Sequence, residues 1–314
     1  MKRKDLLTIV LLLVLVVSVA SLTGYLINAV NSQSTVETMR ELYQQPTDTP
    51  IPTMRAQAEA TEETNPPTAA PTEIPQQTEA LRQAETPQET ETRSDQLPKV
   101  TYGPEAYSRH VTAFAKLIQL NEDIVAWLEV PDLVEQAVVL RDNSYYLTRD
   151  YTGAKNVNGA LFLDECISFS GNARPYTYIV YGHNMKTGAM FGRLSKYEDI
   201  SWYRTHAFVT FNTVYESGEF VIFAVEKRNV TGGETSLYQL YSSSVEVRQA
   251  TIRSIRQGSA IDVPLDVQAD DQLLLLVTCT GDDDERLVIS ARKLREDETE
   301  ERLQSDVIAY CGSK

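Results

Sequence analysis

Three side chains of this sequence have the chemistry needed for covalent acyl transfer. Cys279 follows the apolar run 273–277, and His183 lies in the segment Tyr-Gly-His-Asn-Met, where Gly182 allows a sharp turn. Arg286 opens the next apolar run after a short acidic turn. A thiolate attacks a carbonyl, an imidazole moves protons and a fixed cation stabilises the resulting oxyanion.

Each of these residues also has an ordinary structural explanation. A cysteine at the end of a strand is commonly a small packed hydrophobe, and an arginine beside several acids is commonly half of a surface ion pair. A lone histidine is usually structural or solvated. Spacing along the chain does not show that the three side chains meet, because they belong to segments far apart in the sequence.

The elements that must position these residues are predicted to be mostly β-strands. Short apolar or alternating runs rich in Val, Ile, Tyr and Phe recur between turn residues, which favours strands. They cover residues 126–130, 136–140, 160–163, 176–181, 207–212, 219–225, 272–278 and 286–291. About eight such segments predict a mostly β fold, either a barrel or a sandwich.

Two helices are predicted beside the strands. Residues 105–121 place apolar side chains at helical spacing, which predicts one amphipathic helix at the start of the domain. A second helix is predicted at 243–257, between late strands. Ser243 and Glu246 form a capping-box pattern at its start, and Gly258 suits its end.

The first thirty residues predict a membrane anchor. Basic residues at 2–4 precede an apolar run from 6 to 22 that continues less purely to 30. About twenty apolar residues suffice to cross a bilayer. The positive-inside rule then gives a cytoplasmic tail at 1–5, a single-pass transmembrane signal-anchor at 6–30 and an extracellular remainder at the cell membrane. The alternative is a cleaved signal peptide.

Residues 31–99 differ sharply in composition from the rest. Nine of the 13 prolines lie here, with Thr, Glu and Gln filling most other positions. Such a segment buries too little apolar surface to offset its ordering entropy, which predicts a disordered tether. The folded domain is therefore expected at 100–314.

The net charge argues against one class of partner, and the remaining cysteines, histidines and acidic residues show no further catalytic pattern. Twenty-nine basic and 44 acidic residues give a net charge of −15, which argues against a nucleic-acid partner. Cys166, Cys311, His110 and His206 have no accompanying motif, so we interpret them as non-catalytic. The acidic turn at 282–285 is interpreted as solvated, with a bound cation such as calcium as the alternative.

The region from about 105 to 294 resembles a class B sortase. The blocks that carry this resemblance are NEDIVAWLEVP at 121–131, RDNSYYLTRDY at 141–151, GALFLD at 159–164, YIVYGHNMKTGAMFGRL at 178–194, LLLLVTCT at 273–280 and RLVISARKL at 286–294. The resemblance implies an eight-stranded sortase-type β-barrel, with the helix at 243–257 in a substrate-recognition insert. It also implies the surface of a Gram-positive cell.

The resemblance further implies a cysteine transpeptidase that needs no cofactor and no metal. Cys279 would be the nucleophile, His183 the general acid and base, and Arg286 the oxyanion stabiliser. Arg292 is the competing arginine, because on a regular strand it shares a face with Arg286. The implied partners are surface proteins or pilins with a C-terminal sorting motif, and a cell-wall precursor or pilin amine as acceptor.

Two other functions remain open from the sequence. One is a surface thiol peptidase, which would hydrolyse its substrate without transfer. The other is an inactive barrel that acts as a binding module. Product analysis with and without an added amine separates transfer from hydrolysis, and reactivity toward thiol-directed electrophiles separates an enzyme from an inactive barrel.

Overall fold

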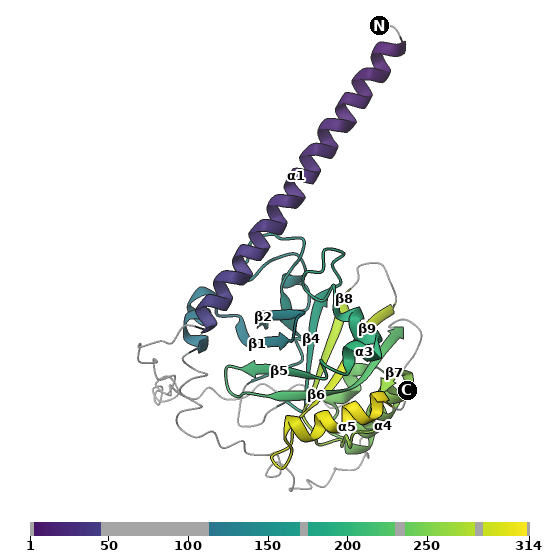
Figure 1. Cartoon of the computed structure of the whole chain (residues 1–314). Helices are drawn as coiled ribbons and strands as arrows, with labels where there is room; N and C mark the ends of the chain where they lie inside the picture. Colours follow the sequence, from purple (N-terminus) through teal and green to yellow (C-terminus); the bar gives the residue numbers. More distant parts are fainter. Residues whose placement is uncertain (1–2, 45–112, 170–174, 230–235, 280–284, 313–314) are drawn as a thin grey trace, which may run out of the picture.

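The computed structural model describes residues 3–44, 113–169, 175–229, 236–279 and 285–312. Most of the tether predicted at 31–99, the first half of the helix predicted at 105–121 with His110, and residues 282–284 of the acidic turn lie outside these ranges. Within the described residues, a long N-terminal helix projects from a β-barrel flanked by shorter helices (Figure 1).

The strands form one continuous sheet. In chain order they are β1 (Ile124–Val130), β2 (Val134–Val139), β3 (Leu161–Leu163), β4 (Thr177–His183), β5 (Phe208–Thr213), β6 (Glu219–Asn229), β7 (Ser259–Asp262), β8 (Leu273–Cys279) and β9 (Glu285–Lys293). Every predicted strand overlaps one of these, whereas β7 was not predicted. Its four residues are too few to show a periodic pattern.

Eight of these strands close into a barrel. The sheet order is β5-β1-β2-β3-β4-β8-β9-β6-β7, and a further pairing of β5 with β6 joins the two ends. The short strand β7 extends the edge of β6 outside this ring. The predicted mostly β, eight-stranded barrel is therefore confirmed, and closure removes the open edges that a flat sheet would expose.

The barrel interior explains the apolar character of the strands. Residues of β4, β6, β8 and β9 contribute to one large buried cluster, in which Ile179, Ile222, Leu275 and Ile289 are fully buried. The run Leu273–Leu276 lacks a polar alternation because β8 lies between β4 and β9 and is covered on both faces. This packing holds the three strands that carry the candidate site residues in a fixed register.

The helices are α1 (Arg3–Gln44), α3 (Ile200–Tyr203), α4 (Val245–Gly258) and α5 (Glu300–Gly312), with a further helical segment at 113–120. Three short 3-10 turns are η1 (Tyr145–Leu147), η2 (Leu194–Glu198) and η3 (Leu237–Tyr241). The helix predicted between late strands is confirmed as α4. Its N-cap is Ser244, one residue later than predicted, and the Ser244 hydroxyl accepts a hydrogen bond from the amide of Val247.

The N-terminal helix differs from the prediction in two ways. Across the part of the chain that the structure describes, no helix combines the length and the apolar character that a membrane crossing requires. The predicted single-pass anchor at 6–30, and the localisation at the membrane that depended on it, are therefore corrected. In addition, α1 continues to Gln44, well beyond the end of the apolar run, and stops just before the first proline, Pro46.

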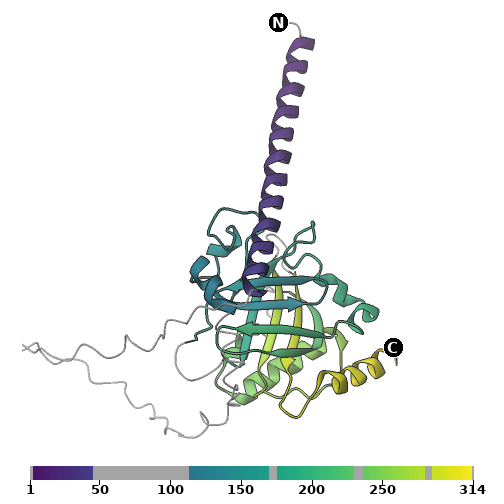
Figure 2. The same ribbon diagram turned by 60° about the vertical axis from the view of Figure 1, so that its left-hand side comes forward.

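The last turns of α1 are helical because they pack on the barrel. Tyr43 stacks on Trp127 with ring centroids 4.4 Å apart, and Met39 is almost completely buried in the same cluster. Arg40 forms an ion pair with Glu135 of β2, with Nε and Oε2 2.7 Å apart. Figure 2 shows α1, in purple, rising from the barrel. Residues 36–44 are therefore part of the folded unit, although composition predicted a tether from residue 31.

Candidate active site

The register of β4 and β8 brings His183 and Cys279 together at one edge of the barrel. The two strands are parallel neighbours, paired continuously from Thr177 with Leu273 to His183 with Cys279. Because the strands run in the same direction, their carboxyl ends lie side by side. The closed barrel thus unites two residues that are distant in the sequence, which spacing alone did not show.

Arg286 lies at the same edge on the opposite side of β8. Strand β9 pairs antiparallel with β8, and the paired positions run from Leu273 with Arg292 to Val277 with Val288. The amide of Leu287 donates a hydrogen bond to the Thr278 hydroxyl at 3.0 Å, which continues this alignment. One further step brings positions 279 and 286 opposite each other. Arg286 is half-buried, and its Nη1 donates to the carbonyl of Glu285 at 3.2 Å.

Arg292 lies at the other end of β9 and has a structural role. It pairs with Leu273, the first residue of β8, and its side chain is 1% exposed. Its Nη1 and Nη2 each lie 2.6 Å from a carboxylate oxygen of Glu298, and its Nε donates to the carbonyl of Asp266 at 2.8 Å. Arg292 is therefore far from Cys279 and its guanidinium is fully engaged.

A backbone carbonyl orients the imidazole of His183. The Nε2 atom lies 2.7 Å from the carbonyl oxygen of Leu147, in η1. Because a carbonyl oxygen only accepts, Nε2 carries a proton in this arrangement. Gly159 makes the approach possible. Its φ is +62°, and a Cβ there would lie 2.9 Å from the Leu147 oxygen and 3.2 Å from Cδ2 of His183.

Gly182 serves packing and does not produce the predicted sharp turn. Strand β4 runs through it to His183 without interruption. A Cβ at Gly182 would lie 2.6 Å from Leu161 and 2.7 Å from Phe191. Glycine is needed because these two apolar side chains fill the space beside the strand, and their packing keeps the end of β4 in place.

Sequence reasoning missed a cluster of tyrosines next to the site. The Tyr181 hydroxyl donates a hydrogen bond to Oδ2 of Asp164 at 3.0 Å. The Tyr238 hydroxyl, in η3, lies 3.5 Å from the Tyr181 hydroxyl. Burial raises the pKa of Tyr181, and the neighbouring Tyr238 and Asp164 raise it further. The position of Tyr181, two residues before His183 on β4, was the only sequence signal for this cluster.

The other cysteines and histidines differ from this arrangement. Cys166 is exposed, but a hydrogen bond to Asp164 and partial burial raise the pKa of its thiol, which disfavours the nucleophilic thiolate. Burial likewise raises the pKa of Cys311 in α5. His206 stacks on Trp202 with ring centroids 3.7 Å apart, and its Nε2 lies 3.1 Å from Asp132.

No trio of His, Cys, Asp or Glu side chains suited to a metal ion occurs within the described ranges. The cation alternative for the acidic turn concerns mainly residues 282–284, which are outside those ranges.

A closed β-barrel that brings a cysteine, a histidine and an arginine to one strand edge supplies the groups that thiol acyl transfer needs. The family profile described as the sortase domain matches residues 128–294, a little over half of the chain. The chain therefore belongs to the sortase family and is a cysteine transpeptidase by type.

Individual relatives agree with class B. Sortase B of Listeria monocytogenes is 29% identical over 172 residues, which cover 54% of this chain and 67% of that protein. Sortase B of Staphylococcus aureus is 24% identical over 190 residues, covering 58% and 75% of the two chains. A solved Bacillus anthracis structure, described as similar to sortase B, has a TM-score of 0.52 and 30% identity, and the match covers 59% of this chain and 84% of that one.

Proposed function

We propose that this protein cleaves a sorting motif near the C-terminus of a substrate protein and transfers the new acyl end to an amine. The single observation that supports this most strongly is the parallel register of β4 and β8, in which His183 and Cys279 are paired positions. The half-buried Arg286 on the neighbouring strand supplies the third group. Surface proteins or pilins are the proposed substrates.

In the acylation step, the Cys279 thiolate attacks the carbonyl carbon of the scissile peptide bond. The carbonyl oxygen becomes an oxyanion, which the Arg286 guanidinium stabilises by charge and hydrogen bonding. His183 donates a proton to the departing nitrogen, so that the C–N bond breaks and a thioester forms. The Leu147 carbonyl holds the imidazole through Nε2 during this transfer.

In the second step an acceptor amine attacks the thioester carbonyl. His183 takes a proton from that amine, the C–S bond breaks and Cys279 leaves as a thiolate. The products are a new amide bond and the free enzyme, so the cycle needs no oxidant or reductant. A cell-wall precursor or a pilin lysine supplies the proposed amine.

The proposal is tested with the full chain, a library of C-terminal sorting peptides and an added amine. Cys279→Ala should lower both cleavage and transfer by at least about a thousandfold, because nucleophile and base act as a unit. Mass spectrometry of the wild type should detect an acyl adduct on Cys279. Cys166→Ala and Cys311→Ala are matched controls that should keep nearly full activity.

Retained turnover in Cys279→Ala would reject the assignment of the nucleophile. Cleavage that yields only hydrolysed peptide, whatever amine is added, would favour the thiol peptidase. Peptide binding without any adduct or cleavage would favour the inactive barrel. Each outcome is read from the masses of the products.

A further inference from the structure

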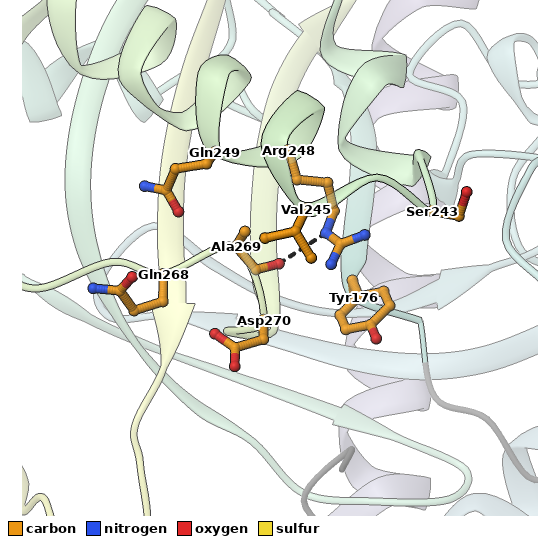
Figure 3. Close-up of a pocket in the computed structure, with 8 residues that line it drawn as sticks. All are labelled: Tyr176, Ser243, Val245, Arg248, Gln249, Gln268, Ala269 and Asp270. Carbon is orange, nitrogen blue, oxygen red and sulfur yellow. Dashed lines mark hydrogen bonds between the residues drawn. The ribbon is translucent and has the colours of Figure 1, made fainter. Parts of the chain in front are cut away.

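A polar cavity lies away from the candidate active site. It has a volume of about 290 Å³ and opens between the start of α4 and the segment that precedes β8 (Figure 3). Tyr176, at its wall, precedes the first residue of β4, whereas His183 ends that strand. At about 3.3 Å per residue, roughly 20 Å separates the cavity from the imidazole.

The central residue of this cavity is Arg248, which is only 3% exposed. Its Nε donates to the carbonyl of Ala269 at 2.8 Å, and its Nη1 donates to the carbonyl of Ser242 at 2.6 Å. The guanidinium also lies over the Tyr176 ring, 4.2 Å from the centroid. These contacts fix the plane and direction of the guanidinium, which Figure 3 shows among the cavity residues.

One side of this guanidinium remains available to a ligand. Among the residues that the structure describes, Nη2 donates no hydrogen bond and no carboxylate lies within ion-pair distance of Arg248, although the charge of Glu246 in the first turn of α4 interacts with it. Its contacts from Nε and Nη1 are both to neutral backbone carbonyls. A buried cation with a free donor is a strong site for an anionic oxygen, because the surrounding protein weakens its screening by water.

The other lining groups restrict the kind of anion. Asp270 lies at the wall with an exposed side chain, which disfavours a ligand of two negative charges. Its acidic neighbours Asp266 and Asp271 are already paired with Arg295, each with a closest N–O distance of 2.8 Å. The lining instead offers acceptors for an N–H group of the ligand, from the Asp270 carboxylate and the amide oxygens of Gln249 and Gln268. Ser243 adds a hydroxyl beside the first turn of α4, whose positive end also favours an anion.

We propose that this cavity binds the carboxylate of a peptide, with Arg248 receiving the carboxylate and Asp270 with the glutamine amides receiving a neighbouring N–H group. The volume suits a fragment of a few heavy-atom groups and is at the small end of ligand pockets. The site is independent of the thioester chemistry, because none of its residues lies at the edge that carries His183.

The probe is N-acetyl-Ala-Ala with a free α-carboxylate, titrated into the full chain and followed by ligand-observed saturation-transfer NMR. Saturable binding is expected, at least tenfold tighter than for the same peptide with an amidated C-terminus. N-acetyl-Ala-Glu-amide tests whether a side-chain carboxylate serves equally well. Inorganic phosphate tests the preference for a single negative charge.

Two variants locate the binding. Arg248→Lys keeps the charge but loses the planar fork, and should weaken binding at least tenfold. If that variant fails to fold, Val245→Trp fills the mouth of the cavity from an exposed position without removing any bond of Arg248, and should abolish binding. Val245→Trp should leave transpeptidation unchanged, because Val245 lies in the cavity and not at the active site. Cys279→Ala should leave peptide binding to the cavity unchanged.

Equal binding of the free and amidated peptides would overturn the proposal, as would binding that survives Val245→Trp. Tighter binding of phosphate than of the peptide would also overturn it. These results are independent of turnover, so they are distinguishable from a failure of the proposed transpeptidation.

Discussion

The two ends of strand β9 carry the same residue type in opposite environments. Arg286 begins the strand beside the edge where β4 and β8 end, and it is half-buried. Arg292, near the other end, is fully buried and bound to both carboxylate oxygens of Glu298. About 20 Å separates the two positions along a regular strand. An arginine whose donors are all occupied fixes structure, whereas Arg286 is partly exposed at the strand edge that carries His183 and Cys279.

The contrast extends to the neighbouring strands. At the Arg292 end, Glu216 accepts hydrogen bonds from Tyr178 and Lys293, which ties together β4, β9 and the turn before β6. At the other end, the His183 ring contacts the backbone carbonyl of Leu147 through Nε2. The first end resists change because several strands depend on it. The second end carries the partly exposed side chains of His183 and Arg286.

Substitution of the two arginines should separate activity from stability most clearly. Arg286→Ala should lower the rate of acylation by about 100- to 1,000-fold, because one oxyanion donor is lost, with little change in the free energy of unfolding. Arg292→Ala should destabilise the protein by about 3 kcal/mol, because Glu298 is left without its partner. Peptide cleavage kinetics and urea unfolding measure the two effects.

The opposite result would reverse the assignment. If Arg292→Ala abolished acylation in a protein that remained folded, while Arg286→Ala remained active, Arg292 would be the oxyanion stabiliser. Arg286→Lys provides a finer test, because a point charge cannot reproduce the planar fork of the guanidinium.

Gly159→Ala should lower activity because an added Cβ would displace the His183 imidazole and the Leu147 carbonyl that orients it. A Cβ there would lie 2.5 Å from the Tyr146 carbonyl oxygen and 2.9 Å from that of Leu147, at a φ of +62°. We expect an activity loss of about tenfold or more, with about 1–3 kcal/mol of destabilisation from the strained backbone. A shifted pH profile of cleavage would show that the imidazole itself is affected.

Gly153→Ala is the matched control. Gly153 also has a positive φ, +80°, but a Cβ there would meet only the Tyr145 hydroxyl, at 3.3 Å. It should therefore cost similar stability while leaving the cleavage rate and its pH profile unchanged. Equal loss of activity in both variants would mean that Gly159 acts through folding alone.

Glu298→Gln should give the smallest effect, about 1 kcal/mol at neutral pH, because the amide keeps one acceptor for Arg292. Burial by itself would raise the pKa of Glu298, but hydrogen bonds from Arg292 and the Arg295 amide lower it below the ordinary value of 4.5. Its stabilising contribution is thus present above that value and is lost as the pH falls through the lower, folded-state pKa.

The measurement is urea unfolding of wild type and Glu298→Gln between pH 6 and pH 3. The wild type should lose more stability over this range, so the difference between the two proteins should shrink in acid. A difference that stays constant with pH would show that the charge of Glu298 contributes nothing.

The sequence by itself determined the strands and the chemical identities of the candidate site residues. The apolar run before Cys279 and the alternation of β5 are local patterns, because each strand must cover the same core wherever it is placed. The block around His183 and the block around Cys279 carried the family resemblance. Local composition was also enough to place α4 within one residue of its start.

Only the tertiary structure decided which distant residues meet. Arg286 and Arg292 lie on the same face of a regular strand, so the sequence pattern of β9 does not distinguish them. The pairing of β9 with β8 places only Arg286 beside Cys279, and Arg292 is bound by the carboxylate of Glu298. Residues 36–44 were assigned to a tether by composition, yet Trp127 provides the surface that makes them helical. The sequence also predicted a membrane anchor that the structure does not support. Contacts between segments far apart in the chain depend on strand register and burial, which no local pattern encodes.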